Sequence, residues 1–462
     1  MLIELRFTPL RFIYGNAICS STNEQVAFSF LRLTFTGAKS ILTTVQFDEV
    51  KKMNFKKSGF ILLAKIFAAI FLLFLISCDT LLTEAPEPHT TLEEPLDGLT
   101  PAELAAFARG DAAFEEEFAA TTGLGPIFNN TACGACHPGD GRAHPSAAFK
   151  LFGRLQGNGI DLLGNLGGPQ LQNRSLPGVP AETLPPEADA VSVRVAPPVF
   201  GVGLIEYIPV ATIVANSDPN DANGDGISGR VHWVTAPDWV PANVVGGGPG
   251  QQLGRFGLKA NTSSLLQQTA RAYHQDIGIT TEFLFVENFR TNTTAPGDLV
   301  ADPELPTPTL QDVVFYIRML APPKRGEITA EVQLGETLFS QIDCASCHLP
   351  KLRTGPSSFA VLANQEVALY SDLLLHDMGP ELADKFIDGD AAGAEWKTRP
   401  LWGVGRTPDA LGGVPSYLHD GRTADLKAAI LLHGGEAKNS RDQFAVLSSA
   451  QMQAVLAFLD SL

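Results

Sequence analysis

Hydrophobic residues recur at helical spacing in several stretches of the chain, and polar capping residues mark where some of these stretches begin. Residues 100–103, Thr-Pro-Ala-Glu, have the form of a capping box with proline at the first helical position. This pattern predicts a helix that runs toward Phe118. One face of a second predicted helix, which ends before two prolines, carries Leu310, Val313, Val314, Ile317 and Leu320.

The same arrangement returns in the last third of the chain. Thr329 is expected to cap a shorter helix that continues through Phe339. Residues 448–451, Ser-Ser-Ala-Gln, open a final helix, whose apolar face carries Met452, Val455, Leu456 and Leu459. The pattern therefore predicts two pairs of helices, and a long stretch of loops separates the members of each pair.

A cysteine motif follows the first helix of each pair. Residues 133–137 read Cys-Gly-Ala-Cys-His and residues 344–348 read Cys-Ala-Ser-Cys-His, which is the C-x-x-C-H pattern that attaches c-type haem. Thiols at this spacing can reach the vinyl groups on one edge of a porphyrin, and the adjacent histidine can then bind the iron. The predicted haem-binding residues are Cys133, Cys136, Cys344 and Cys347, with His137 and His348 as iron ligands.

Paired cysteines also occur in zinc sites and in thioredoxin-like dithiols. Zinc does not require a histidine directly after each pair, and a dithiol does not need two copies. Once four cysteines are assigned to haem, only Cys19 and Cys78 are left of the six in the chain. We therefore expect two covalent haem groups and no disulfide framework.

The order of helix, haem motif, loops and closing helix occurs twice, which indicates an internal duplication. A second echo supports it, because residues 196–203, APPVFGVG, parallel residues 398–405, TRPLWGVG. We predict a mostly α fold with two cytochrome c-like domains and long irregular loops. The expected domains span residues 100–325 and 326–462.

The N-terminal region has the form of an export signal. Residues 53–57 are a short basic start with two lysines, residues 60–76 form an apolar run, and this run ends in Leu-Ile-Ser before Cys78. This ending resembles a bacterial lipobox, in which Cys78 would be lipidated, and an uncleaved membrane anchor is the alternative. We expect a lipid-anchored bacterial lipoprotein, exported to the periplasm or the outer face of a membrane. Residues 1–52 are then a misassigned leader, 53–78 the signal peptide and 79–99 a flexible linker.

The net charge narrows the choice of partners. The formal net charge of the 462-residue chain is −17 at pH 7, which argues against nucleic acid as a partner. An acidic face could attract a basic redox partner, although most acidic surfaces of exported proteins are only solvated. A cytochrome c or another electron donor or acceptor is the expected partner.

The stretch from Arg399 to Ala437 resembles the C-terminal half of bacterial di-haem cytochrome c peroxidases and MauG-like enzymes, in which a His-Asp-Gly motif follows the second haem. The chain is most similar to the family of di-haem oxidoreductases described as putative peroxidases. Four further stretches carry this resemblance, namely residues 191–209, 254–268, 276–280 and 369–384. The resemblance covers nearly everything from about residue 100 to residue 462.

The resemblance implies a division of labour, in which the second haem relays electrons and the first haem reacts with peroxide. In the peroxidases, a methionine ligand of the relay haem comes fourteen residues after the histidine of the His-Asp-Gly motif. Here that histidine is His419 and the matching residue is His433. We therefore expect His348 and His433 to bind the second iron together, unless His433 is only a surface histidine. An imidazole in place of a thioether should lower the potential of the relay haem, which puts peroxidase activity in the narrow sense in doubt.

The repeat places Ala272 opposite His433, so the first haem is expected to have an open or weakly filled sixth position. Peroxide cleavage needs a group that moves a proton between the two oxygens. By analogy with the relatives, Asp276 is the first candidate for this role and Glu206 is the second. His274 is a possible resting-state ligand of the first iron, although a capping or surface role fits it equally well.

Three other features have a functional and a structural interpretation. Residues 218–226 resemble the start of a calcium-binding loop. The expected bidentate glutamate at position twelve is absent, because His232 stands there. The segment is therefore either a Ca²⁺ site or an Asx-rich turn. Trp402 could pass electrons between the haems or be a packed core residue. His376 could act near the second haem or make a structural hydrogen bond. The function predicted overall is a peroxidase-like di-haem oxidoreductase, and the alternative is a non-catalytic di-haem electron carrier.

Overall fold

Residues 92–242, 250–288 and 300–462 are described by the computed structural model. The predicted leader, the export signal with Cys78 and most of the predicted linker lie outside these residues. Within the described ranges, no helix is both long and apolar enough to cross a membrane.

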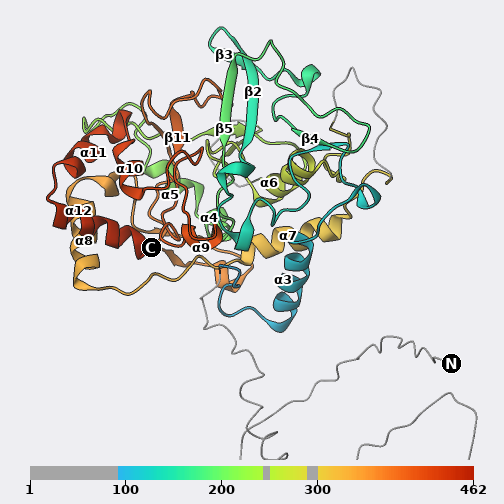
Figure 1. Cartoon of the computed structure of the whole chain (residues 1–462). Helices are drawn as coiled ribbons and strands as arrows, with labels where there is room; N and C mark the ends of the chain where they lie inside the picture. Colours follow the sequence, from blue (N-terminus) through green and yellow to red (C-terminus); the bar gives the residue numbers. More distant parts are fainter. Residues whose placement is uncertain (1–91, 243–249, 289–299) are drawn as a thin grey trace, which may run out of the picture. The chain divides into compact units, whose positions relative to one another are not determined.

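Short and medium-length helices alternate with long loops in the described part of the chain (Figure 1). In chain order, the helices are α3 Pro101–Phe114, α4 Val202–Glu206, α5 Val210–Ala215, α6 Leu265–Ala272, α7 Thr307–Met319, α8 Ala330–Gln341, α9 Thr407–Ala410, α10 Leu426–Leu431, α11 Lys438–Ala445 and α12 Ser449–Asp460.

The predicted helix starts are confirmed. Thr100 and Glu103 form a reciprocal capping box at the start of α3, and Ser448 and Gln451 form another at the start of α12. The Thr329 side chain accepts a hydrogen bond from the backbone at the start of α8. α3 ends earlier than expected, at its fourteenth residue, because three successive acidic residues, 115–117, follow it. Negative charge at the C-terminal end of a helix is unfavourable.

α3 packs on α7, and α8 packs on α12 (Figure 1). A glycine lies at each crossing. A Cβ atom on Gly110 would lie 2.1 Å from the carbonyl oxygen of Asp312, and one on Gly335 would lie 1.9 Å from that of Ala454. Both helix pairs therefore depend on the missing side chain of a glycine in their first helix.

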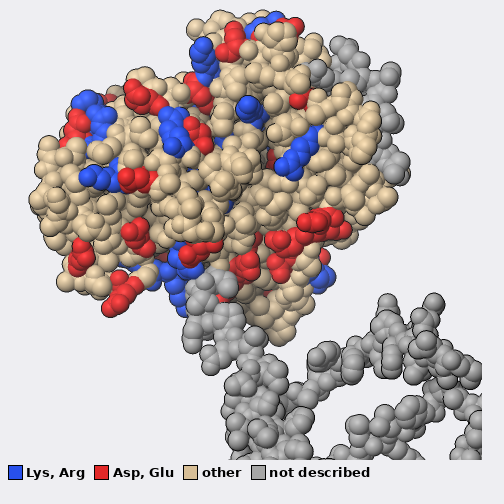
Figure 2. Space-filling view, viewed as in Figure 1, with Lys and Arg blue, Asp and Glu red and all other residues tan. Residues whose placement is uncertain are grey.

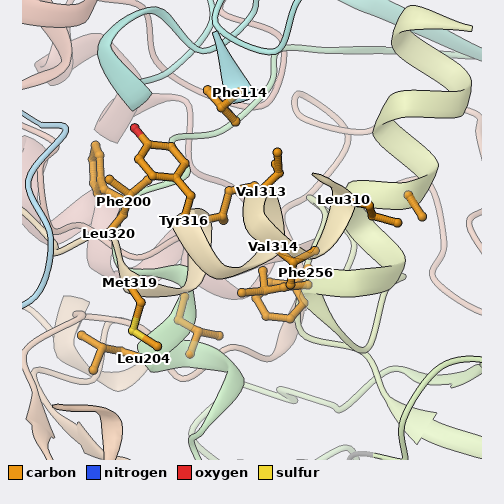
Figure 3. Packing of buried hydrophobic residues seen from close by; sticks show 14 of the residues in the cluster. Phe114, Phe200, Leu204, Phe256, Leu310, Val313, Val314, Tyr316, Met319 and Leu320 are labelled. Atoms are coloured by element: carbon orange, nitrogen blue, oxygen red, sulfur yellow. The ribbon is translucent and has the colours of Figure 1, made fainter. Parts of the chain in front are cut away.

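The predicted apolar face of α7 is confirmed by the core around it. Leu310, Val313 and Val314 are buried and lie in a cluster with Phe114 and Phe256 (Figure 3). The same cluster includes residues from beyond the expected domain boundary, namely Leu352, Leu362, Val367, Leu369, Leu373, Leu374 and Trp402. A second core lies between α8 and α12 and contains Phe339, Tyr370, Phe444 and Phe458. The first core is thus completed by the C-terminal part of the chain.

The sheets are small and antiparallel. Their order is β3–β2–β5 in the three-stranded sheet, and the two-stranded sheets are β1–β4, β6–β7, β8–β9 and β10–β11. The strands are β1 Ile127–Phe128, β2 Phe149–Gln156, β3 Gly159–Asp161, β4 Arg174–Ser175, β5 Ala190–Arg194, β6 Trp233–Thr235, β7 Gln251–Leu253, β8 Leu352–Arg353, β9 Glu366–Val367, β10 Leu375–Asp377 and β11 Glu395–Lys397. Helical residues outnumber strand residues, but "mostly α" describes the chain only in part. Buried and exposed residues do not alternate along β2, the longest strand, so its sequence lacks the period of two that would have revealed it.

The predicted internal echo is also present in space. Gly201 and Gly403 both have positive φ angles, of 72° and 71°. Trp402 lies against Gly201, and Phe200 lies against Gly403, so each copy of the repeated segment uses its aromatic residue to cover the glycine of the other. This reciprocal contact supports the duplication and brings the two copies together in the interior.

Candidate functional site: two facing cavities

Each C-x-x-C-H motif folds as a tight turn. The backbone N–H of His137 donates to the carbonyl of Cys133 over 3.0 Å, and that of His348 donates to the carbonyl of Cys344 over the same distance. The four thiols of the two motifs are free and partly buried. Each turn therefore presents two thiols and one imidazole close together, as attachment of a porphyrin edge requires.

Both motifs open onto a cavity. The cavity lined by Cys133, Cys136 and His137, here called the first cavity, measures about 250 Å³. The cavity lined by Cys344, Cys347 and His348, the second cavity, measures about 240 Å³. The two cavities are thus similar in size.

The two motif histidines are held with one ring nitrogen directed at backbone. Nδ1 of His137 lies 3.4 Å from the carbonyl oxygen of Gly141, and Nδ1 of His348 lies 2.9 Å from that of Tyr370. Burial lowers the pKa of each imidazole to about 4, so both rings are neutral at pH 7. A neutral ring that donates through Nδ1 leaves the Nε2 lone pair available to a metal.

His433 lines the second cavity together with His348. It follows α10, and its Nδ1 lies 2.9 Å from the carbonyl oxygen of Ala429. Burial lowers the pKa of His433, and the ring is therefore prepared as a neutral ligand in the same way as the motif histidines. Ligation of an iron by His348 and His433 stays a prediction.

The structure supports the alignment that places Ala272 opposite His433. The N-cap residues Ser264 and Asp425 open α6 and α10 at corresponding positions. Immediately before them, the isolated bridge between Phe256 and Thr262 matches the bridge between residues 417 and 423. Ala272 lines the first cavity but offers no atom that can bind a metal.

Asp276 also lines the first cavity. It lies in the π-helical turn Tyr273–Ile277, which directly continues α6, and such turns are frequent at functional sites. Its carboxylate accepts a hydrogen bond of 2.5 Å from Nε2 of Gln170. Burial raises the pKa of Asp276 to about 6, against the opposing effects of Gln170 and the cation of Arg271. Such a carboxyl group can both take up and release a proton near neutral pH.

Glu206 and His274 do not reach the cavity. The Glu206 carboxylate pairs with Arg318 at 2.7 Å and accepts a hydrogen bond from the backbone N–H of Leu265, at the start of α6. Nε2 of His274 lies 2.8 Å from the carbonyl oxygen of Val286. Neither side chain is among the residues that line the first cavity. Of the two candidate acids, only Asp276 lies where it could act.

Sequence reasoning missed a group of buried and half-buried cations on the cavity walls. Arg142 lines the second cavity, Arg194 and Arg271 line the first, and Lys397 and Arg399 line both. No local signal marks Arg142, because its side chain contacts residues more than 270 positions away, at Ser416 and Leu418.

These cations give a test of whether the cavities fit haem. Nη1 of Arg142 and Nη2 of Arg194 are buried and have no hydrogen-bond partner among the described residues. A buried donor of this kind calls for an anionic or polar group inside the cavity. Haem carries two propionate carboxylates, and the cysteine and histidine residues supply its other contacts. The donor set of each cavity therefore fits a haem group.

Two further predicted residues lie at this site. Trp402 lines both cavities and also lies in the first core, so a role between two cofactors stays a prediction. His376 lines the second cavity, with Nε2 2.8 Å from Asp372 and Nδ1 2.7 Å from Glu436. Hydrogen bonds to these carboxylates outweigh burial and raise the pKa of His376 to about 12. His376 is thus held between two carboxylates, and a role in the chemistry of the second cavity stays a prediction.

The suspected calcium loop is internally hydrogen-bonded. The carboxylates of Asp218, Asp221 and Asp225 each accept backbone N–H groups from residues two to five positions farther along. They are not among the described acidic, histidine and cysteine groups that come close enough together to hold a metal. These contacts are those of an Asx-rich turn.

Comparison with known proteins gives a family for this pair of cavities. The model of the family described as "Di-haem oxidoreductase, putative peroxidase" matches residues 78–156 and 186–462. The chain belongs to this di-haem oxidoreductase family. Membership implies haem cofactors, oxidoreductase chemistry and a redox partner.

Comparisons with individual proteins show a weaker likeness. No curated protein sequence matches the chain. It is similar to the hydrazine synthase of Kuenenia stuttgartiensis, with 16% identity and a TM-score of 0.33 over 83% of this chain and 98% of that chain. It is also similar to a MauG-like protein associated with microbial copper homeostasis, with 13% identity and a TM-score of 0.35 over 82% of this chain and 94% of that chain. Neither likeness is close enough to carry an argument about activity.

Proposed function

We propose that the protein is an exported oxidoreductase with two covalent c-type haems, in which the second haem relays electrons to a first haem that reacts with peroxide. The observation that carries this proposal is the difference between the two cavities. At corresponding positions, the second cavity has His433 and the first has Ala272. The first cavity has in addition a buried carboxyl group, Asp276. One cavity is thus equipped to saturate an iron and the other to leave it reactive.

The residues of the first cavity can supply the proton chemistry that peroxide reduction needs. The overall reaction takes up two electrons and two protons and converts one peroxide into two waters. Haem iron, when bound, would hold one peroxide oxygen and pass the two electrons on to the O–O bond. The Asp276 carboxylate takes the proton from the near oxygen and returns it to the far oxygen, which leaves as water. Gln170 holds Asp276 in place, and burial keeps its pKa close to 6.

Trp402 is the proposed route between the two haems, because it is an aromatic residue on the wall that the cavities share. The electron donor is proposed to be a small redox protein of low potential, since imidazole ligation at His433 lowers the potential of the relay. Acidic side chains gather around α3 and α7 on the face shown in Figure 2, which favours a basic partner. Export as a lipoprotein rests on residues 53–78 and is part of the proposal. Calcium is left out of it, since the candidate carboxylates are engaged with the backbone.

The alternative is an electron carrier in which both irons are fully ligated. Optical and EPR spectra of purified protein, matured in a host that attaches haem, distinguish the two. We expect one low-spin and one high-spin haem per chain, with only the high-spin signal responding to peroxide and to cyanide. Two low-spin haems whose spectra do not change with peroxide or cyanide would support the electron carrier. Protein that contains no covalent haem would overturn both functions.

A further inference from the structure

The two cavities share one wall. Its residues line both cavities and are Pro198, Leu258, Lys397, Arg399, Pro400 and Trp402. Two of these six residues are cationic. A charge on this wall acts on the contents of both cavities at once, whereas a charge elsewhere on the lining acts mainly on one.

Arg399 is the cation on this wall that lacks a protein partner. No hydrogen bond or ion pair to its guanidinium occurs within the described residues, and the charges that face it, Arg142 and Lys397, are themselves positive. Burial lowers the pKa of Arg399 only to about 10, so the group stays charged at pH 7. Arg399 is half-buried on the wall of both cavities, so an anionic group held inside the cavities is the counter-charge within its reach.

The other cations near this wall are engaged differently. Nζ of Lys397 donates to the carbonyl of Arg255 over 2.7 Å. Arg194 is paired with Asp388 at 2.8 Å and lines only the first cavity. Arg142 lines only the second cavity, and Arg271 lines only the first. Of the two cations on the shared wall, Arg399 is the one without a hydrogen bond or ion pair to protein within the described residues, whereas one N–H of Lys397 is held by the backbone.

We propose that Arg399 pairs with the propionate carboxylates of both haems and sets the reduction potentials of the two together. This inference rests on the two c-type haems of the proposed function, but not on reactivity with peroxide. Reduction of either iron adds one electron beside a fixed positive charge. The guanidinium therefore stabilises the reduced form of both haems, and it acts as a tuning and positioning residue rather than as a catalytic one.

Loss of this charge should lower both potentials. A unit charge about 10 Å away in a medium of effective dielectric constant near 20 changes a one-electron equilibrium by about tenfold. A tenfold change for one electron corresponds to about 59 mV. Effects of this size are resolved for each haem by spectroelectrochemical titration, because the high-spin and low-spin haems have different spectra.

The experiment compares glutamine variants of three arginines in the full-length, haem-loaded protein. R399Q is expected to shift both haems about tenfold toward the oxidised form. R142Q is expected to shift the second haem and R271Q the first, each with a smaller effect on the other haem. R399K keeps the charge and should leave both potentials close to those of the parent protein. R399M is made in parallel with R399Q, so that poor maturation of one variant leaves the other to be measured.

The assignment of Arg399 would be overturned if R399Q or R399M, with both haems attached, changed the reduction potential of only one haem or of neither. Equal shifts of the potentials in R399K and R399Q would also overturn this assignment, because the shifts would then come from altered packing rather than from the lost charge. A first haem that does not react with peroxide would contradict the proposed enzyme and leave this inference standing. Protein with fewer than two haems per chain would contradict both.

Discussion

At the scale of single residues, Asp276 has the properties that the proposed chemistry needs. It lines the first cavity, accepts a hydrogen bond from Gln170 and has a pKa raised by burial to about 6. We expect D276N to reduce peroxide at least about 100-fold more slowly, because proton transfer by a positioned side chain typically contributes at least that factor. Stopped-flow spectroscopy of the first haem measures the rate. D276E is the matched control, and it should retain part of the peroxide-reduction rate because it keeps the carboxyl group.

The pH dependence follows from the same carboxyl group. Only the unprotonated form can take the proton of peroxide, so the rate in the parent protein should fall as the pH drops through about 6. The rate in D276N should show no such step. The sign for stability is opposite: an acid whose folded pKa lies above its unfolded pKa of about 3.8 destabilises the fold as the pH rises through about 6. D276N should therefore be at least as stable as the parent at pH 8, and a large loss of stability there would indicate a structural role.

At the scale of elements, α6 and α10 occupy corresponding places but differ in one potential iron ligand, which is Ala272 in the first repeat and His433 in the second. Substitution can add this ligand to one repeat and remove it from the other. A272H places an imidazole at the end of α6, at the position that corresponds to His433 beyond α10. We expect it to convert the first haem to a low-spin form that no longer responds to peroxide. H433A should do the reverse and make the second haem high-spin. EPR spectra of the two variants and the parent protein measure both changes. An unchanged low-spin signal in H433A would show that another residue ligates the second iron.

The helix crossings give a prediction about stability. G335A should destabilise the protein by about 1–3 kcal/mol, because its Cβ would lie 1.9 Å from the carbonyl oxygen of Ala454 and the backbone of α12 would have to move. This cost exceeds the gain of about 1 kcal/mol that alanine brings to a helix in place of glycine. Urea unfolding measures the difference. G164A is the control, since nothing lies within 4 Å of the added atom; an equal loss in both variants would rule out the crowded crossing as the cause.

The elements also show what could be predicted from the sequence. Thr100, Thr329 and Ser448 are local signals, because a capping residue and the helix it starts are neighbours in the chain, and all three predictions are confirmed. The strands carry too few residues and too irregular a burial pattern to be recognised. The cavity cations were missed for a different reason. Arg142 and Arg399 acquire their roles only through contacts between segments hundreds of residues apart, and such contacts leave no pattern along the chain.

At the scale of the whole molecule, the two repeats are interdependent. The core around α7 is completed by residues such as Leu369 and Trp402 from the C-terminal part of the chain. Arg142 donates to Ser416 and Leu418, and Arg194 pairs with Asp388, so polar contacts also cross the boundary expected at residues 325 and 326. The reciprocal packing of Trp402 on Gly201 and of Phe200 on Gly403 adds a contact in each direction.

This interdependence predicts how the chain behaves when it is divided. A fragment of residues 79–325 would expose the apolar surface that Leu352, Leu362 and Trp402 cover, and it would leave Arg194 without Asp388. Such a buried charge without its partner is strongly destabilising. We expect the fragment to be degraded in limited proteolysis under conditions that leave the full chain intact, and to become resistant when residues 326–462 are co-expressed with it. A fragment that is resistant alone would mean that the expected domain boundary separates two independent folding units, and the shared wall of the cavities would then form by docking after folding.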